Sequence, residues 1–373
     1  MARRNLRLRV DDTGRLEVVD PGLDTLALLQ AIDPGFRIRR AALPAFRTPR
    51  FTRLRQQGCG LVEGESADLP EAALWEIHGR LAATVRGGSP PRRRWPGEAS
   101  VLALKAALAE RLLAPCRLCA LRCGVDRRRG ERGRCALGPD ATVAEHFVHI
   151  GEEAPINPSL MISLAGCGLR CRFCQQSPLL KPRQIGGEPL DATLWTRLNT
   201  QGARSLSFIG GNPDESLPAI LRFLEQAPAG WKLPIVWNSH AFATPETLRL
   251  LDGVVDAYVP DFKFASERCG HRLAGIADYP QLALVAIKAM LGQEVPVLVR
   301  VLVLPDHVDC CHVPALQSLA ALQAPHLMVS IRGQYCPAGR VTERDGALAR
   351  RPTTGEIAAV RERARNLGLR MVS

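Results

Sequence analysis

The stretch Gly166-Cys167-Gly168-Leu169-Arg170-Cys171-Arg172-Phe173-Cys174 places three cysteines at the spacing CxxxCxxC. It follows the apolar run 160–165, and an apolar run that closes on a glycine predicts a buried strand entering a loop. Parallel α/β enzymes place their ligands on such loops. Three thiolates on one loop can hold three irons of a [4Fe–4S] cube and leave the fourth iron open, whereas cubes that only transfer electrons usually have four cysteines. A zinc loop or three structural thiols is the alternative interpretation.

This pattern, with Phe173 directly before the last cysteine, resembles the radical SAM superfamily, and within it the relatives of pyruvate formate-lyase activating enzyme. The resemblance implies a cluster on Cys167, Cys171 and Cys174, with Phe173 beside the cofactor, whose open iron binds S-adenosylmethionine (SAM). Reductive cleavage of SAM gives a 5′-deoxyadenosyl radical that abstracts hydrogen from a substrate. A reductant protein of the flavodoxin or ferredoxin type is the implied electron donor.

Composition is that of a globular enzyme. The 373 residues suffice for one large domain and an appendage, with 46% apolar and 23% charged residues. No apolar run approaches a membrane span and the start lacks a signal-peptide core, so we expect a cytoplasmic protein without membrane contact. Twelve cysteines in close clusters then indicate metal or redox chemistry rather than disulfides.

The net charge of +12 is carried almost entirely by arginine. The basic stretches 91–94 and 127–129 lack the interleaved aromatic residues of a nucleic-acid platform. We therefore expect no nucleic-acid partner, and interpret these stretches as a solvated surface or a docking patch for an acidic protein.

Residues 1–97 form a predicted α+β extension of unknown role. Alternating apolar residues over 6–18 predict a β-hairpin, and the patterns over 24–32 and 70–86 predict helices. His78 lies near the apolar face of the second helix and is expected to be packed there. A breaker-rich linker over 87–97 predicts the first domain boundary.

The next segment, 98–150, is predicted to contain a helix and a second cysteine group. This group has the pattern CxxCxxxC-x₁₁-C and consists of Cys116, Cys119, Cys123 and Cys135. Four thiolates form a complete ligand set for zinc or for a second iron–sulfur cluster. Unbound structural or redox thiols are the alternative.

Residues 151–335 alternate short apolar runs with helical patterns. The predicted strands are 160–165, 205–209, 234–237, 256–262, 296–303 and 327–331, and the predicted helices are 191–201, 214–225, 245–251, 279–291 and 310–322. This alternation predicts an α/β fold with a parallel sheet and right-handed crossovers. Six such units agree with the partial (β/α)₆ TIM-like barrel that the resemblance implies. Residues 336–373 are expected to close it with a helix and a strand at 369–372.

The loop after the second strand resembles the GGEP motif that holds the amino group of SAM. Here Gly210 and Gly211 permit close approach of backbone to a ligand, and Asn212 replaces the usual glutamate. An amide oxygen still accepts from an ammonium group, but the charge must come from Asp214 or Glu215. A simple tight turn is the alternative.

Polar residues also follow the third and fourth strands. By resemblance, Asn238 and His240 contact the ribose or carboxylate of SAM, although either residue could cap the next helix. Asp261 and Lys263 point the same way on extended chain, so Lys263 would face the SAM carboxylate or the substrate. A simple ion pair between them is the competing account.

Arg300 stands alone in an apolar fifth strand, and burying it without a partner would cost several kcal/mol. A bidentate contact with the SAM carboxylate would satisfy it. At the mouth of the barrel, Gln334 and Tyr335 are expected to contact adenosine or substrate. The tandem Cys310-Cys311 shows no ligand spacing with another cysteine, which predicts loop thiols.

Three functions remain open from the sequence. The first is a radical SAM enzyme acting on a peptide or small molecule, which we favour because the chain carries more than a barrel. The second is an activase that abstracts hydrogen from a glycine of a partner protein. The third is a non-catalytic, zinc-stabilised binding module, towards which only Asn212 points.

Overall fold

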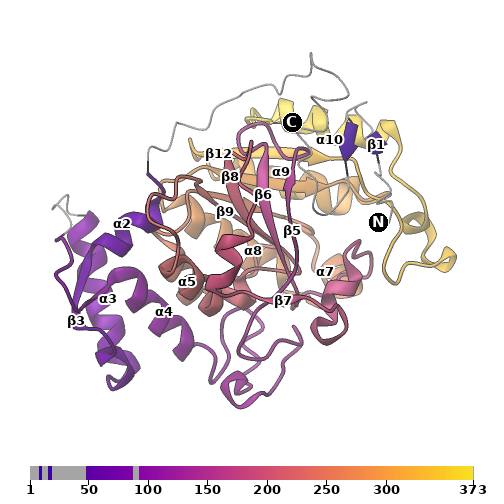
Figure 1. The fold of residues 1–373 in the computed structure, drawn as a ribbon. Coiled ribbons are helices and arrows are strands. Elements are labelled where there is room, and N and C mark those ends of the chain that lie inside the picture. Colours follow the sequence, from indigo (N-terminus) through magenta and orange to yellow (C-terminus); the bar gives the residue numbers. More distant parts are fainter. Residues whose placement is uncertain (1–7, 11–15, 19–47, 87–91, 373) are drawn as a thin grey trace.

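The computed structural model describes residues 8–10, 16–18, 48–86 and 92–372 (Figure 1). Its centre is an eight-stranded sheet with the order β12-β11-β10-β9-β8-β6-β5-β7. Six consecutive strands of this sheet pair in parallel and confirm the six predicted strands. They are β6 (Ser159–Leu164), β8 (Ser205–Gly210), β9 (Ile235–Ser239), β10 (Ala257–Pro260), β11 (Val297–Leu302) and β12 (Leu327–Arg332).

Two further strands extend the sheet beyond β6. β5 (Thr142–His149) pairs antiparallel with β6, and the short β7 (Glu188–Pro189) pairs antiparallel with β5. Neither strand was predicted. β5 matters for function because Glu145 and Phe147 on it reach the cavity described below.

Helices connect the parallel strands. They are α5 (Leu217–Glu225), α6 (Pro245–Leu251), α7 (Glu267–Ala274), α8 (Tyr279–Leu291) and α9 (Val313–Ala320). The predictions for 245–251 and 279–291 are confirmed to the residue. The prediction of a helix over 191–201 is wrong, since only a 3₁₀ turn forms at Ala192–Thr196. Asp191 and Asn199 each accept a hydrogen bond from a backbone amide two residues on, which favours turns over a helix.

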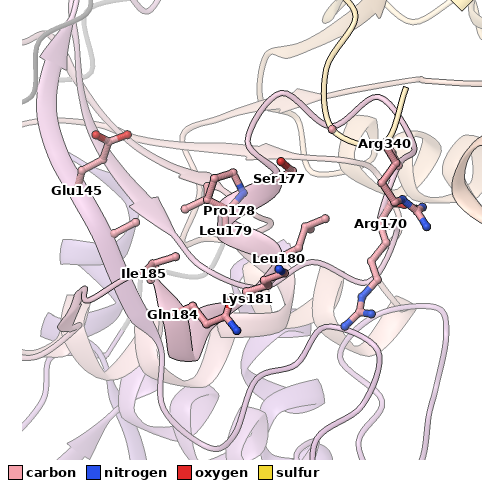
Figure 2. A pocket seen from close by; sticks show the side chains of 13 residues that line it. Glu145, Arg170, Ser177, Pro178, Leu179, Leu180, Lys181, Gln184, Ile185 and Arg340 are labelled. Atoms are coloured by element: carbon pink, nitrogen blue, oxygen red, sulfur yellow. The ribbon is translucent and has the colours of Figure 1, made fainter. Parts of the chain in front are cut away.

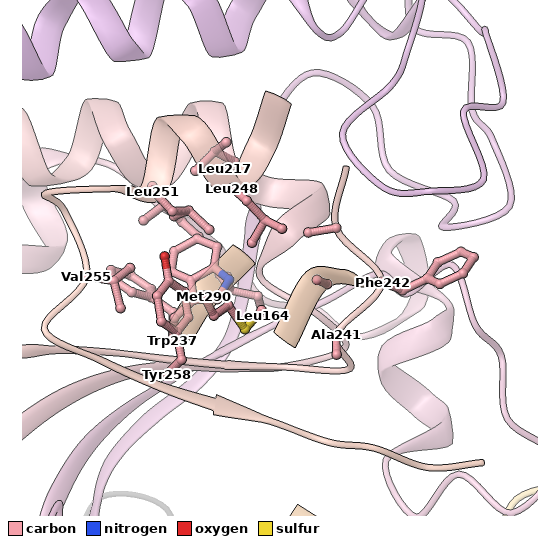
Figure 3. Packing of buried hydrophobic residues seen from close by; sticks show 14 of the residues in the cluster. Leu164, Leu217, Trp237, Ala241, Phe242, Leu248, Leu251, Val255, Tyr258 and Met290 are labelled. Atoms are coloured by element: carbon pink, nitrogen blue, oxygen red, sulfur yellow. The ribbon is translucent and has the colours of Figure 1, made fainter. Parts of the chain in front are cut away.

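The main core lies between the sheet and these helices (Figure 3). Trp237 on β9 and Tyr258 on β10 are paired in register, and neither is exposed. Leu248 and Leu251 of α6 and Met290 of α8 belong to the same cluster. Each such side chain contributes about 1.5–3 kcal/mol through burial, so this layer holds the strand ends in place.

A small α+β unit precedes the sheet and lies to one side of it, with α4 next to α5 (Figure 1). It contains α2 (Arg50–Gln56), β3 (Gly58–Val62), α3 (Glu71–Arg86), β4 (Glu98–Ser100) and α4 (Val101–Arg111). β3 pairs with β4 across the predicted boundary at residue 97. His78 of α3 is buried and lies 2.9 Å from Nζ of Lys105, so it is packed as predicted.

The ends of the chain complete the description. β1 (Leu8–Val10) pairs antiparallel with β2 (Leu16–Val18), which confirms the hairpin, whereas the predicted helix 24–32 lies outside the described residues. α10 (Thr354–Asn366) is the closing helix, and the expected last strand is reduced to a single bridge between Met371 and Val329. Across the described residues, every helix is too short or too polar to cross a bilayer.

Candidate active site at the carboxyl ends of the parallel strands

A cavity of about 330 Å³ opens at the ends of the parallel strands. Most of the residues predicted for the barrel site line it, and they come from six segments that are far apart in the sequence. They are Cys167, Cys171, Phe173, Cys174, Gly210, Gly211, Asn212, Asn238, His240, Asp261, Lys263, Arg300 and Gln334. Because the carboxyl ends of parallel strands meet at one edge of the sheet, sequence-distant loops converge there.

The cysteine loop follows β6 and is clamped by the glycine pair that follows β8. The amide of Gly211 donates to the carbonyl of Leu164 over 2.6 Å. A Cβ on Gly211 would stand 2.1 Å from the carbonyl oxygen of Gly166, so only glycine permits this approach. The glycines therefore fix where the three thiols stand.

The three thiols of the cysteine loop all line the cavity. Among the described residues, Cys167, Cys171 and Cys174 do not form a group whose sulfurs all lie within 4.8 Å of one another. Thiolates that bind different irons of a cube stand farther apart than thiolates that share one ion. Burial, together with the neighbouring thiols, raises the pKa of Cys171 to about 12.

Glu215 links the cysteine loop to the Gly-Gly-Asn turn. Its Oε1 accepts from the amide of Gly168 over 2.9 Å, and its Oε2 accepts from the side-chain amide of Asn212. Burial raises the pKa of this carboxyl, but contacts with His240, Asn212 and Gly168 outweigh burial and leave the pKa below its usual value. A carboxylate thus lies behind Asn212, although it does not line the cavity.

The other acid considered near Asn212 serves the core. Asp214 is fully buried and accepts from Nε1 of Trp237 over 2.7 Å. His240 lies 3.6 Å from Glu215 and also contacts the Cys167 thiol; burial lowers the pKa of His240, but Cys167 and Glu215 together raise it to about 10.

Asp261 and Lys263 form an ion pair within the cavity. Nζ of Lys263 lies 2.7 Å from Oδ2 of Asp261. Burial lowers the pKa of Lys263, but attraction to Asp261 and to the Cys171 thiolate outweighs it and leaves the pKa above its usual value. Both the ion pair and a cavity-facing cation are therefore present, so the two interpretations are compatible.

The argument that Arg300 requires a ligand is wrong, because the protein itself supplies its partners. Nε of Arg300 lies 2.8 Å from Oε1 of Glu153, and Nη2 also contacts Glu152. Arg332 lies 3.4 Å from the same Glu153. Glu152 and Glu153 lie about 150 residues away along the chain, in the loop between β5 and β6, so strand pattern alone could not reveal them. Arg300 still lines the cavity.

The loop after β12 contributes less than expected. Gln334 lines the cavity, and its carbonyl accepts from Gln175 over 3.4 Å. Tyr335, expected at the mouth, is instead fully buried and donates to the carbonyl of Leu348 over 2.7 Å. Phe173 packs edge-to-face on Tyr335 and Phe264. Tyr335 therefore packs against Phe173 of the cysteine loop from the core and does not face the cavity.

A second cavity of about 860 Å³ adjoins the first (Figure 2). The two cavities share Glu145, Cys171 and Leu180 in their linings. Glu145 lies on the opposite side of the second cavity from Arg170 and Arg340 (Figure 2). Burial raises the pKa of Glu145. Glu145 was not predicted as a site residue, because it lies on the antiparallel strand β5, which was itself not predicted and carries no recognisable catalytic motif.

The four-cysteine segment packs against the same loops. Cys116, Cys119 and Cys135 are buried and Cys123 is exposed. A Cβ on Gly168 would stand 3.6 Å from the sulfur of Cys119, which places this segment beside the cysteine loop. Arg127 was expected on a surface basic stretch but is buried, and its Nη1 donates to the carbonyl of Glu215 over 2.7 Å.

Within the described residues, no three of these four cysteines have sulfurs all within 4.8 Å of one another. Burial raises the pKa of Cys135 to about 11.

A further cysteine group was missed. The sulfurs of Cys269, Cys310 and Cys311 all lie within 4.8 Å of one another. The interpretation of Cys310 and Cys311 as isolated loop thiols is therefore wrong. No local spacing could have revealed the group, because Cys269 lies 41 residues before Cys310.

Comparisons with known proteins give one uncharacterized relative and several distant structural neighbours. No family model matches the chain. The uncharacterized protein MJ0674 of Methanocaldococcus jannaschii is 29% identical over 308 residues, which cover 80% of this chain and 89% of that protein. SuiB of Streptococcus suis bound to S-adenosylmethionine aligns with a TM-score of 0.39 and 15% identity over 55% of this chain and 47% of SuiB. SuiB bound to its precursor peptide SuiA aligns with a TM-score of 0.38 and 13% identity over 80% of this chain and 61% of SuiB. The chain thus spans less than two thirds of SuiB.

Proposed function

We propose that this protein is a radical SAM enzyme that abstracts hydrogen from a peptide or small-molecule substrate. The observation that carries the proposal is the convergence of the three loop cysteines and ten further predicted site residues on one cavity at the strand ends. We further take the six parallel strands to form a partial (β/α)₆ barrel, because their order in the sheet follows their order in the chain.

In this proposal Cys167, Cys171 and Cys174 hold a [4Fe–4S] cluster with one open iron. When bound, the cluster supplies the electron that cleaves the sulfonium of SAM to a 5′-deoxyadenosyl radical. The chain positions the reactants. Asn212, whose Oδ1 already accepts from the amide of His240 and whose side-chain amide donates to Glu215, would accept from the SAM ammonium, and Lys263 would face the SAM carboxylate.

We propose that the substrate binds in the larger adjoining cavity, because Cys171 lines both cavities. Arg170, Lys181 and Arg340 line it and favour a substrate with carboxylate groups. Glu145, at the junction, is available to accept a proton or hydrogen bond from the substrate. A flavodoxin- or ferredoxin-type protein remains the proposed electron donor.

For the four-cysteine segment we propose a second iron–sulfur cluster in preference to zinc. Its position against Gly168 would place the second cluster next to the first. The alternative of an activase for a glycyl-radical partner uses the same chemistry and differs only in the substrate.

Anaerobic reconstitution with iron, sulfide and SAM tests the proposal, with metal content and 5′-deoxyadenosine measured together. We expect about four irons per cluster, hence about eight in total, and deoxyadenosine after reduction by dithionite. Cys171→Ala should lose deoxyadenosine formation, whereas Cys59→Ala, on the distant strand β3, should retain it. Zinc without iron, or unchanged product from Cys171→Ala, would refute the proposal and favour the binding module.

A further inference from the structure

Three thiols outside the proposed active site converge from two separate segments. Cys269 lies on α7, whereas Cys310 and Cys311 lie on a π-helical turn, Val308–His312, that precedes α9. The sulfurs of Cys269 and Cys310 are 3.8 Å apart, and all three sulfurs lie within 4.8 Å of one another. None of the three residues lines the cavity at the strand ends.

This spacing fits one ion shared by three thiolates. Zinc–sulfur bonds of about 2.3 Å place the sulfurs of a tetrahedral site about 3.8 Å apart. A disulfide would need about 2.05 Å between the sulfurs. In the described part of the chain, no other cysteine group is this compact, including the group proposed to hold the cluster. The distances between the sulfurs therefore distinguish this group from the group proposed to hold the cluster.

The backbone on both sides of the group is held in place. Oγ of Ser266 caps α7 by accepting from the amide of Cys269 over 3.4 Å. The amide of Cys311 donates to the carbonyl of His307 over 3.1 Å. Nε2 of His312 accepts from the amide of Leu304 over 2.9 Å. Cys269 and Cys311 thus present their thiols from anchored positions.

The group is open to solvent on the side of Cys310. Cys310 is exposed, whereas Cys269 and Cys311 are buried, so an ion enters from the Cys310 side. Both ring nitrogens of His307 have partners, since Nε2 lies 3.0 Å from Nη2 of Arg272 and Nδ1 lies 2.7 Å from the carbonyl of Pro305, and Nε2 of His312 accepts from the amide of Leu304. Water is then the fourth ligand, as in three-ligand zinc sites.

We propose that Cys269, Cys310 and Cys311 bind one thiophilic divalent ion of the zinc class. Binding displaces the three thiol protons, since the thiolate is the ligand, and changes no oxidation state. The ion would tie the segment after β10 to the segment after β11. The amide of Arg172 in the cysteine loop donates to the carbonyl of Leu273 on α7 over 2.7 Å. An ion bound to Cys269 on α7 would therefore stabilise the helix that contacts the cysteine loop.

The zinc content of the cluster-reconstituted protein tests the site. The protein is incubated anaerobically with Zn²⁺ and desalted, and zinc and iron are counted for wild type, Cys310→Ser and the control Cys59→Ser. We expect one zinc fewer in Cys310→Ser than in the other two, with the same iron in all three. Equal zinc in all three would overturn the proposal, as would a disulfide between Cys269 and Cys310 or Cys311 in anaerobically purified protein. Iron content reports separately on the proposed enzyme.

A second measurement needs no variant. Alkylation by iodoacetamide is followed by mass spectrometry at Cys310 and at Cys336, which is half-buried in another loop. We expect Zn²⁺ to slow labelling of Cys310 at least tenfold and to leave Cys336 unchanged. Equal labelling of Cys310 with and without Zn²⁺ would overturn the proposal.

Discussion

The backbone amide of Gly168 donates a hydrogen bond of 2.9 Å to Oε1 of Glu215, and both groups are buried. This bond joins the cysteine loop after β6 to the turn after β8. Its acceptor is charged, and a hydrogen bond to a charged group contributes about 1.5–3 kcal/mol. One carboxylate that does not line the cavity therefore joins the two loops that carry most of the proposed cofactor contacts.

Replacement of Glu215 should loosen the cysteine loop. In Glu215→Gln the charge that accepts from Gly168 and Asn212 is lost, so we expect iron to leave the reconstituted protein several-fold faster in the presence of a chelator. Glu225→Gln on α5 is the matched control, because Glu225 bonds only to the amino-terminal unit. Identical iron-release rates for the two variants would show that Glu215 does not stabilise the cluster loop.

Loss of Lys263 should weaken SAM binding without loss of the cluster. Lys263→Met removes the cation that faces the cavity, and a charged hydrogen bond of about 1.5–3 kcal/mol corresponds to roughly tenfold to hundredfold weaker affinity. Calorimetry with the reconstituted protein measures the change. Lys181→Met is the control, because Lys181 lines only the larger cavity. Equal affinities in both variants would remove Lys263 from the SAM site.

Arg300 should matter first for stability. Arg300→Met leaves the buried carboxylates of Glu152 and Glu153 without their main partner, which costs about 3–5 kcal/mol of unfolding free energy. Urea unfolding measures the loss. The triple variant Arg300→Met, Glu152→Gln, Glu153→Gln should recover much of it, because the uncompensated charges are gone. A single variant as stable as wild type would contradict this account of the network.

Lys105 should make stability depend on pH above neutrality. Burial lowers the pKa of its amine from 10.5 to about 7. Between these values the unfolded chain binds a proton that the folded chain does not, so stability rises as pH increases from 7 towards 10.5, by up to about 1.4 kcal/mol per pH unit. Below pH 7 the full cost of protonating the buried amine remains.

Comparison with two variants isolates this contribution. Lys105→Met should be more stable than wild type near pH 7 and should lose that part of the pH dependence, whereas Lys288→Met on the exposed face of α8 should keep it. Urea unfolding midpoints between pH 6 and 10 give the comparison. Parallel pH profiles for Lys105→Met and wild type would show that the folded amine keeps its ordinary pKa.

Much of the site was accessible from local pattern. The spacing of Cys167, Cys171 and Cys174, the glycine pair and the polar residues at strand ends are all features of short segments. Once the strands are parallel and in chain order, their loops must meet at one edge, so the shared cavity follows from the order of elements. The incorrect helix prediction over 191–201 shows where apolar periodicity fails as a guide. The side chains of Asp191 and Asn199 accept hydrogen bonds from nearby backbone amides and so favour turns over a helix.

The sequence by itself determined the strand order, the loop chemistry and the edge of the sheet at which that chemistry gathers, because hydrophobic period and glycine placement act over a few residues. Only the tertiary structure decided which distant side chains meet. Arg300 finds Glu153 across 147 residues and Cys269 finds Cys310 across 41. Such pairings depend on how helices and loops pack over the sheet, and no local pattern records that packing.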